Sequence, residues 1–485
     1  AFPLGYKTLD DPDYTYRFGY YLCIVWILFC GLFTVVYLVR RCRIPHTGGF
    51  LWLPMLPIAV ALVYGILYIL QFPWLRRIAG DMTVVQCLTF TATYEACIQC
   101  GLIQSNSGYA SFFEVSSAKG IITDIWNSMY ETIANVNNLI ARLDKNGQEV
   151  ITTPGSWELM KGEALALRAF LHFDLLRMYG PVYKEEPEKE CIPYRKEFKP
   201  ETSPLLSASK VLELVLADLK EADTYLAQDS VNWGNDAENP FKAYRGHRMN
   251  KYAAKALQAR VLLYRGGSED LAEAGRIAKE VIGQCGLKLV RDNFQDIAMF
   301  DETLFALHMD DMEDRLESYF NVSAADDGSA LWITPTNAEG AFEVTSSVGR
   351  NDIRYKFGYG LYNGGTKGLM CRKYLPTQNY VYKENLPLIR LGEMYLIAAE
   401  ATGDAEYLND LRNARGISAV YDLDEVTETA LDAEYRKEFF AEGQYFYFLK
   451  RHAMKTFYRC PPSLEGKMSS FQYVFPLTDD EKEYN

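Results

Sequence analysis

The sequence predicts a mainly α-helical protein of tetratricopeptide-like helical hairpins, preceded by two transmembrane helices. Three observations carry this prediction. Two long uncharged stretches lie near the N-terminus, a helical period recurs from Ile121 onward, and an irregular, aromatic-rich insertion interrupts it at residues 286–384. Charge divides the chain similarly, since residues 1–118 hold seven basic and six acidic residues, whereas residues 119–485 hold 43 and 57. We therefore expect a membrane segment over 1–118 and a helical domain over 119–485.

The membrane prediction rests on two segments, Phe18–Val39 and Gly49–Leu70, neither of which carries a charge. The first has 22 residues, which at about 1.5 Å per residue span roughly 33 Å, enough to cross a hydrocarbon core. Arg40, Arg41 and Arg43 in the connection favour a cytoplasmic position for it, whereas Arg76 and Arg77 beyond the second segment favour the opposite orientation. A pair of buried helices in a soluble core is the alternative.

Residues 119–485 show the period of amphipathic helices. Ile125, Met129, Ile133, Val136 and Ile140 fall on one face of a first helix, which ends near Asn146 and Gly147. Further helices are predicted over about 157–179, 207–226, 250–265, 271–282, 387–401, 405–415 and 426–442. Alanines fall where two helices must approach closely, which is typical of tetratricopeptide hairpins, although no clean repeat period is present.

Several of these helices carry distinctive runs of residues. They are IWNSMYETIANVNNLIA (125–141), GEALALRAFLHFDLLRMYGPV (162–182), NKYAAKALQARVLLYRG (250–266), LPLIRLGEMYLIAAEA (386–401), YLNDLRNARG (407–416), YRKEFFAEGQYFYFLKR (435–451) and the tail YVFPLTDDEKEYN. In this order they resemble the SusD/RagB-like family of outer-membrane nutrient-binding lipoproteins, over about residues 119–485. The family motif positions are Glu163, Arg168, Tyr179, Arg390, Glu393, Glu400, Arg412, Glu438, Glu442 and Arg451. Residues 1–118 do not resemble the family, which favours a chimera of two unrelated pieces.

The resemblance implies tetratricopeptide-like units packed on a more irregular ligand-binding part. It also implies a binding protein rather than an enzyme, without a cofactor, on the extracellular face of the outer membrane. Such a protein would bind an oligosaccharide or another nutrient and pass it to a SusC-like TonB-dependent transporter. Two alternatives stay open: a helical-repeat scaffold that binds only proteins, and a membrane-anchored sensor with a helical extracytoplasmic domain.

Candidate ligand-binding residues lie in the aromatic-rich insertion. Sugar rings present flat C–H faces fringed by hydroxyls, so their sites combine an aromatic platform with planar polar groups. Trp332 is the leading candidate for the platform. The other candidates are Tyr319, Phe320, Asn337, Tyr359 and Tyr362. The alternative for Trp332 is that its indole anchors the core of the insertion itself.

Other functional classes are disfavoured. The net charge of −13 argues against nucleic acid as a partner, because phosphate binding needs a basic face. Glu434, Glu438 and Glu442 recur every four residues beside two basic residues, which predicts a structural ion network. A glycosidase instead needs two carboxylates that face each other across a cleft. Arg390 and Glu393 have the spacing of a helical ion pair.

No metal site is predicted. The five histidines are scattered and lack the spacing of zinc ligands. Asp310, Asp311, Glu313 and Asp314 could offer oxygen ligands to calcium. They lack the glycine-punctuated spacing of an EF-hand loop, so a solvated acidic turn is favoured.

Overall fold

The computed structural model describes residues 116–199, 203–234, 240–291, 298–310, 331–356, 360–363, 368–374, 384–460 and 465–484, with Thr91, Asp296, Met312, Leu316, Phe320 and Pro462. Contacts divide the chain into Ala1–Ala79 and Gly80–Asn485, and all described residues belong to the second unit. The predicted membrane helices Phe18–Val39 and Gly49–Leu70 lie outside the described residues and stay predictions. Among the residues that are described, no helix combines the length and the apolarity needed to cross a membrane.

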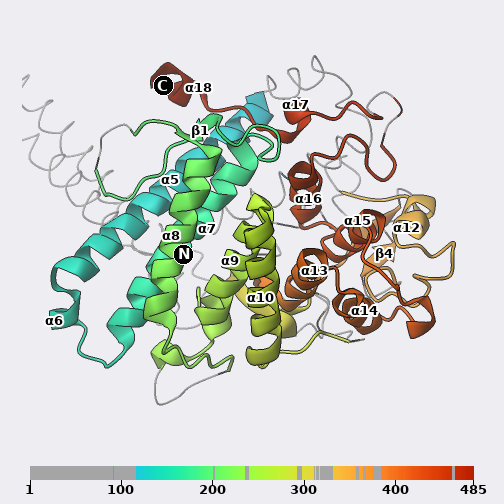
Figure 1. Cartoon of the computed structure of the whole chain (residues 1–485), viewed down its shortest axis with the longest axis horizontal. Coiled ribbons are helices and arrows are strands. Elements are labelled where there is room, and N and C mark those ends of the chain that lie inside the picture. Colours follow the sequence, from blue (N-terminus) through green and yellow to red (C-terminus); the bar gives the residue numbers. More distant parts are fainter. Residues whose placement is uncertain are drawn as a thin grey trace, which may run out of the picture. The chain divides into compact units, whose positions relative to one another are not determined.

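The described part is mainly helical, as predicted (Figure 1). Its α-helices are α5 (Ser116–Arg142), α6 (Gln148–Val150), α7 (Ser156–Tyr179), α8 (Ala208–Leu226), α9 (Lys251–Arg265), α10 (Ser268–Gln284), α12 (Pro335–Ala341), α13 (Leu391–Thr402), α14 (Ala405–Ala414), α15 (Glu428–Glu438), α16 (Gln444–His452), α17 (Ser470–Tyr473) and α18 (Asp479–Tyr484). Short antiparallel strands pair β1 (Glu190–Ile192) with β2 (Leu206–Ser207), β3 (Thr303–His308) with β6 (Asn385–Arg390), and β4 (Leu361–Asn363) with β5 (Leu369–Cys371).

Helices that are near in sequence pack on one another in succession. Helix α7 contacts α5 and α8, α9 contacts α8 and α10, and α10 contacts α13, which in turn contacts α14 and α15. Figure 1 shows this order as α5, α7 and α8, then α9 and α10, then the C-terminal helices. Helices such as α8 and α10 bury an apolar stripe against their neighbours, as in stacked helical repeats. The predicted hairpin architecture is therefore confirmed for the described helices.

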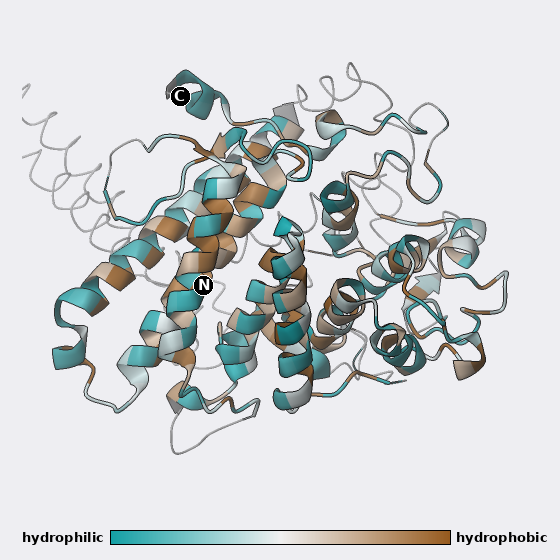
Figure 2. Ribbon diagram, viewed as in Figure 1, coloured by the Kyte–Doolittle hydropathy of each residue, from teal (hydrophilic) through white to brown (hydrophobic). Residues whose placement is uncertain are grey.

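The helix boundaries follow from local capping. The Ser207 side chain accepts a hydrogen bond from the backbone N–H of Lys210 at 3.3 Å, at the start of α8. The Asn250 side chain accepts from Tyr252 and Ala253 at the start of α9. Both caps satisfy backbone donors that a helix start leaves without partners. Brown apolar residues lie along the helix faces that meet, and teal polar residues lie on the outer faces (Figure 2).

Two predicted helices differ from the structure. Residues 387–390 belong to strand β6 and not to a helix, because they pair with β3, so helix α13 begins only at Leu391. The predicted helix over 426–442 ends at Glu438, and α16 starts at Gln444. Between them Ala441 and Gly443 have φ angles of 63° and 69°, which a right-handed helix does not allow. The insertion 286–384 also holds regular elements, namely β3, α12, β4 and β5.

Two glycines of α10 test how closely the helices approach. A Cβ at Gly275 would lie 2.6 Å from Cγ2 of Thr402 on α13, whereas a Cβ at Gly283 would meet nothing within 4 Å. We expect Gly283→Ala to raise the free energy of unfolding by about 0.5–1 kcal/mol, since alanine favours helix. Gly275→Ala should instead lower it by about 1–3 kcal/mol through overpacking. Urea denaturation of both variants measures this, and equal effects would contradict a close α10–α13 contact.

Candidate functional site

A buried cluster of charges surrounds Glu438 at the end of α15. Its Oε1 accepts hydrogen bonds from Nη1 of Arg390 at 2.5 Å and Nη2 of Arg415 at 2.7 Å, and its Oε2 accepts from Nη1 of Arg354 at 3.0 Å. All of these side chains are buried. Burial opposes ionisation of Glu438, but the Arg415 and Arg390 charges outweigh it and hold its pKa well below the usual range. This arrangement balances charge within the core.

Glu434, one helical turn earlier, has a similar environment. It accepts from Arg354 at 3.0 Å, from Arg412 at 3.2 Å and from Lys437 at 2.5 Å. Burial opposes its ionisation, but the Lys437, Arg354 and Arg412 charges prevail and lower its pKa to about 2. The structural ion network predicted for α15 is thus present. A general acid needs a raised pKa, so Glu434 and Glu438 are unsuited to that role.

The predicted ion pair between Arg390 and Glu393 is wrong. Arg390 bonds to Glu438, whereas Glu393 accepts two hydrogen bonds of 2.6 Å from Arg260 on α9. The physical reason is that Arg390 lies in strand β6 and only Glu393 lies in helix α13. The spacing of three residues brings side chains together only within one helix.

The remaining family motif positions connect neighbouring helices. The Arg168 guanidinium donates to both carboxylate oxygens of Asp218, at 2.6 and 2.9 Å, and so connects α7 to α8. Glu400 of α13 accepts from Arg451 of α16 at 2.6 and 2.8 Å. The other contacts are Glu163 with Arg245 and Arg248, Tyr179 Oη donating to Ile122 O, and Glu442 with Arg390 and Lys373. These residues stabilise the helical array.

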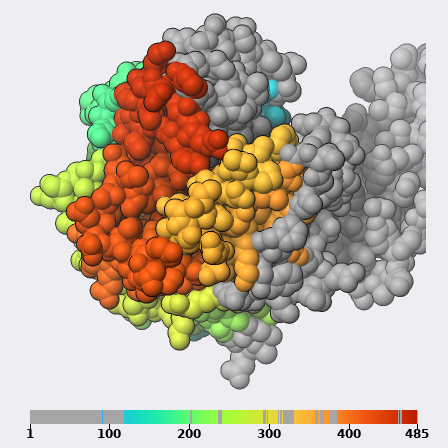
Figure 3. All heavy atoms as spheres, turned by 90° about the vertical axis from the view of Figure 1, so that its right-hand side faces the viewer, coloured from blue at the N-terminus to red at the C-terminus, as the bar shows by residue number. Residues whose placement is uncertain are grey.

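The same network holds the aromatic lobe, by which we mean the described residues among 331–374. Lys373 donates to the backbone oxygens of Glu438 and Phe440, at 3.1 and 3.3 Å, and to Glu442 at 2.5 Å. Lys437 of α15 bonds to Glu343 of the lobe at 2.6 Å. The charged side chains of α15 therefore fix the position of the lobe. Figure 3 shows the lobe, in yellow and orange, at the surface beside the C-terminal segment in red.

Trp332 lies at the surface of this lobe, with 47% of its area exposed. The next residue, Ile333, forms an isolated bridge to Leu369, with backbone hydrogen bonds of 2.8 Å in both directions. Gly368 lies directly against the indole, where a Cβ would be 2.8 Å from Cε3 of Trp332 and 2.5 Å from the Ile333 oxygen. Glycine therefore allows the chain to support one side of the ring. The exposed part of the indole remains available as a stacking surface.

Asn337 lies in the first turn of α12, which begins after Thr334. The Thr334 hydroxyl accepts from the Asn337 backbone N–H at 3.2 Å and caps this helix. The side-chain oxygen of Asn337 accepts a hydrogen bond from Arg459. The planar amide of Asn337 and the guanidinium of Arg459 therefore meet at the first turn of α12, the helix that follows Trp332. Sequence reasoning did not identify Arg459, because it lies 122 positions from Asn337.

Other predicted binding residues have different surroundings. Phe320 is fully buried and packs against Tyr374 at a centroid distance of 4.9 Å, so it has no exposed face for a ligand. Its prediction as a binding residue is corrected here, since Phe320 belongs to a small core with Met309, Met312 and Leu316. Tyr362 is half-buried and donates its hydroxyl to the Phe320 oxygen. Tyr319 and Tyr359 lie outside the described residues.

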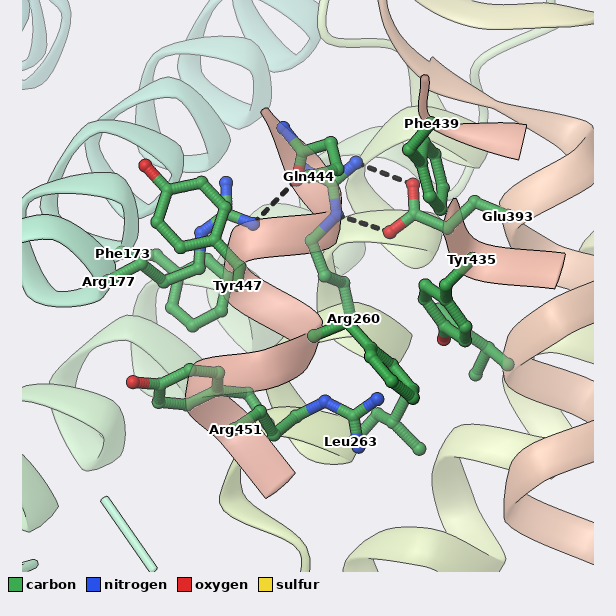
Figure 4. Close-up of a pocket in the computed structure, with 13 residues that line it drawn as sticks. Phe173, Arg177, Arg260, Leu263, Glu393, Tyr435, Phe439, Gln444, Tyr447 and Arg451 are labelled. Atoms are coloured by element: carbon green, nitrogen blue, oxygen red, sulfur yellow. Dashed lines mark hydrogen bonds and ion pairs between the residues drawn. The ribbon is translucent and has the colours of Figure 1, made fainter. Parts of the chain in front are cut away.

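A small pocket of mixed aromatic and charged lining lies between α7, α9, α13, α15 and α16 (Figure 4). The Arg177 guanidinium lies 4.1 Å from the Tyr447 ring centroid and donates to Gln444 at 2.9 Å, while Arg260 bonds to Glu393. Its volume of about 40 Å³ has room for roughly three water molecules. The charged groups of this pocket already bond to one another, whereas the indole of Trp332 is exposed, so we place the candidate site at Trp332.

Comparison with known protein families gives two matches. Residues 100–263 match a family described as starch-binding and associating with the outer membrane, and residues 314–481 match the SusD family. Between them these models cover about two thirds of the chain. The first match begins before residue 119, so the family resemblance extends further toward the N-terminus than the recognised motifs. The chimera near residue 118 stays a prediction.

Individual relatives are distant. A SusD-like protein of Bacteroides ovatus is 24% identical over 195 residues, and this match spans 38% of the chain but only 31% of that relative. A SusD-like carbohydrate-binding protein of Bacteroides vulgatus has 18% identity and a TM-score of 0.58, covering 84% of this chain and 96% of the other. A laminarin-binding SusD-like protein has 18% identity and a TM-score of 0.55, covering 83% and 96%. A structure with xylogluco-oligosaccharide has 16% identity and a TM-score of 0.50, covering 79% and 83%.

The matches agree with the buried charges described above. The motif residues that connect the helices fall inside the two matched segments, and the fold of the solved relatives covers the same helical array. Over residues 100–263 and 314–481, this chain is therefore similar to SusD-like proteins.

Proposed function

We propose that this protein binds an oligosaccharide without catalysing a reaction, as the glycan-binding component of a SusC/SusD-type TonB-dependent uptake complex. The observation that carries the proposal is the exposed, backbone-supported indole of Trp332. Two relatives with the same fold support it, one a laminarin-binding protein and the other solved with a xyloglucan-derived oligosaccharide. Laminarin and the xyloglucan-derived oligosaccharide are ligands of those two proteins. The glycan that this chain binds is to be identified by experiment.

Trp332 suits this role for physical reasons. An indole offers a large rigid apolar face, so stacking a sugar ring on it orders few rotatable bonds. The Ile333–Leu369 bridge and Gly368 hold the ring before any ligand arrives. Asn337 and Arg459 add planar polar groups of the kind that bind sugar hydroxyls. Tyr319, Tyr359 and Tyr362 stay proposals as further contacts.

The proposal that this protein catalyses no reaction rests on the ionisation state of its buried carboxylates. Glu434 and Glu438 of the described residues each accept hydrogen bonds from several cations in the core. Hydrolysis of a glycosidic bond needs one protonated and one ionised carboxyl group on opposite sides of the bond. These two glutamates have lowered pKa values and face a core of arginines, so they support binding alone.

Replacing Trp332 by alanine tests the site. We expect the full chain to bind one polysaccharide of a panel that includes laminarin, xyloglucan and starch, in affinity electrophoresis and calorimetry. Trp332→Ala should weaken this binding at least about tenfold, equivalent to about 1.4 kcal/mol. Phe471→Ala is the matched control, because Phe471 is also 47% exposed. Binding that Trp332→Ala leaves unchanged would refute the placement of the site.

The partner and the location are proposed on the family alone. We propose a SusC-like TonB-dependent transporter as partner and the extracellular face of the outer membrane as location. Protease accessibility in intact cells and co-purification with a TonB-dependent transporter would test both. A chain that intact cells protect from protease, with no transporter attached, would favour the membrane-anchored sensor.

A further inference from the structure

Strands β3 and β6 bring Glu384 beside His308 and Asp310, which lie far earlier in the sequence. His308 is the last residue of β3 and pairs with Asn385, the first residue of β6, while Glu384 precedes Asn385. The backbone N–H of Met309 donates to the backbone oxygen of Glu384 at 2.7 Å. This bond holds the two segments together just beyond the paired strands. One ligand atom each from His308, Asp310 and Glu384 lies within 4.8 Å of the others.

The orientation of the His308 ring is set by Asn385. Nδ1 of His308 lies 3.1 Å from Oδ1 of Asn385, and Nε2 of His247 lies 2.8 Å from the same oxygen. An amide oxygen has two lone pairs and accepts from both rings, so Nδ1 of His308 carries a proton. The lone pair of the neutral ring is then on Nε2. A hydrogen bond of this kind to the second nitrogen is what orients metal-binding histidines.

Nε2 of His308 lies beside two carboxylate groups. It lies 3.0 Å from Oδ1 of Asp310 and 3.9 Å from Oε2 of Glu384. A lone pair directed at two carboxylates is repulsive unless a positive species lies between them. Ligands of one tetrahedral zinc ion, at about 2.0–2.2 Å from it, lie roughly 3.4 Å apart. The two separations from Nε2, 3.0 and 3.9 Å, lie on either side of that value.

We infer that His308, Asp310 and Glu384 form a binding site for a divalent transition metal of the zinc type. Imidazole and carboxylate are ligands that zinc accepts, and three protein ligands leave a fourth position for water. The side chains of His308, Asp310 and Glu384 are 45%, 92% and 39% exposed, so the ion reaches them from solvent. The site uses none of the residues proposed for glycan binding.

Calorimetry of the full chain tests the site. The protein is freed of metal with EDTA, transferred to metal-free buffer and titrated with zinc chloride. We expect the original chain to bind zinc saturably. One of its zinc sites should be lost, or weakened at least tenfold, in both Asp310→Asn and His308→Gln. Zinc should also raise the thermal midpoint of the original chain, because it binds only the folded site, and should not raise that of Asp310→Asn.

Asp310→Asn keeps the test decisive, because its exposed side chain can change without disturbing the core. Glu406→Gln, an exposed carboxylate on α14, is the matched control and should bind zinc like the original chain. Zinc binding that is equal in the original chain, Asp310→Asn and His308→Gln would place the ion elsewhere and overturn the inference. No saturable binding would overturn it too, since a proton alone would then bridge the three groups.

Discussion

Glu438→Gln is expected to lower the free energy of unfolding by about 3–5 kcal/mol. The carboxylate of Glu438 is bonded to Arg354, Arg390 and Arg415, and all four side chains are 2% exposed or less. Glutamine keeps the size of the side chain but removes its charge. Three buried guanidinium groups then share Glu302, Asp352, Glu434 and Glu442 as their remaining carboxylate partners. Urea denaturation followed by circular dichroism measures the loss.

The matched control for this variant is Glu273→Gln. Glu273 is bonded to Arg276 on the surface of α10 at 2.7 Å, with the two side chains 43% and 57% exposed. Exposed pairs of this kind contribute about 1 kcal/mol or less, because water screens both charges. The comparison therefore separates a buried from an exposed carboxylate–arginine contact. A loss for Glu438→Gln as small as that for Glu273→Gln would show that the buried network does not stabilise the fold.

Protonation of Glu400 and Glu434 as the pH falls from about 5 to 2 is expected to remove about 6 kcal/mol of stability. Burial opposes ionisation of Glu400 and Glu434, but nearby cations outweigh it and lower the pKa of each to about 2. In the unfolded chain a glutamate has a pKa of about 4.3, so each group contributes roughly 3 kcal/mol above that pH. The unfolded state binds protons first as the pH falls, and the contribution is lost between about pH 4.3 and 2.

Urea denaturation at several pH values between 5 and 2.5 checks this expectation. Glu400→Gln should be less stable at pH 5 and should show a weaker dependence on pH, because one of the groups that titrate in this range is gone. An unfolding free energy that is the same at pH 5 and pH 3 would contradict the prediction. So would a Glu400→Gln variant whose dependence on pH equals that of the original chain.

Lys450 acts in another pH window and does not disturb this measurement. Its buried ammonium donates to the backbone oxygens of Arg177 and Gly180, both at 2.7 Å, and burial lowers its pKa to about 7. The unfolded pKa is about 10.4, so the unfolded state binds the proton more readily between these values. Lys450 therefore makes stability rise with pH from about 7 to 10.4, and its contribution is constant below pH 5.

Most helices were predictable because their pattern is local. The apolar period, the caps at Ser207 and Asn250, and the alanines at helix contacts each depend on a few neighbouring residues. Where a predicted helix was wrong, a distant segment decided the outcome. Residues 387–390 became a strand because β3 pairs with them, and β3 lies some 80 positions earlier in the chain.

The candidate site was predictable in part. The aromatic insertion has no period, so nothing local distinguishes an exposed ring from a buried one, and Trp332 and Phe320 were both candidate ligand-binding residues. Tertiary packing separates them, since Phe320 lies in a core with Tyr374 while the chain supports only one side of Trp332. Charged residues of α15 were recognised as a network, but their partners were not.

The amino-acid sequence alone determines the helical periods, the family motifs and the sign of the charges along α15. The tertiary structure alone decides which charges meet, because Glu302 and Arg415 are 113 positions apart and Arg390 and Glu438 are 48 apart. It also decides that His308, Asp310 and Glu384 converge, through the pairing of β3 with β6. The physical reason is that periodicity depends on near neighbours, whereas exposure and charge pairing depend on how the whole chain packs.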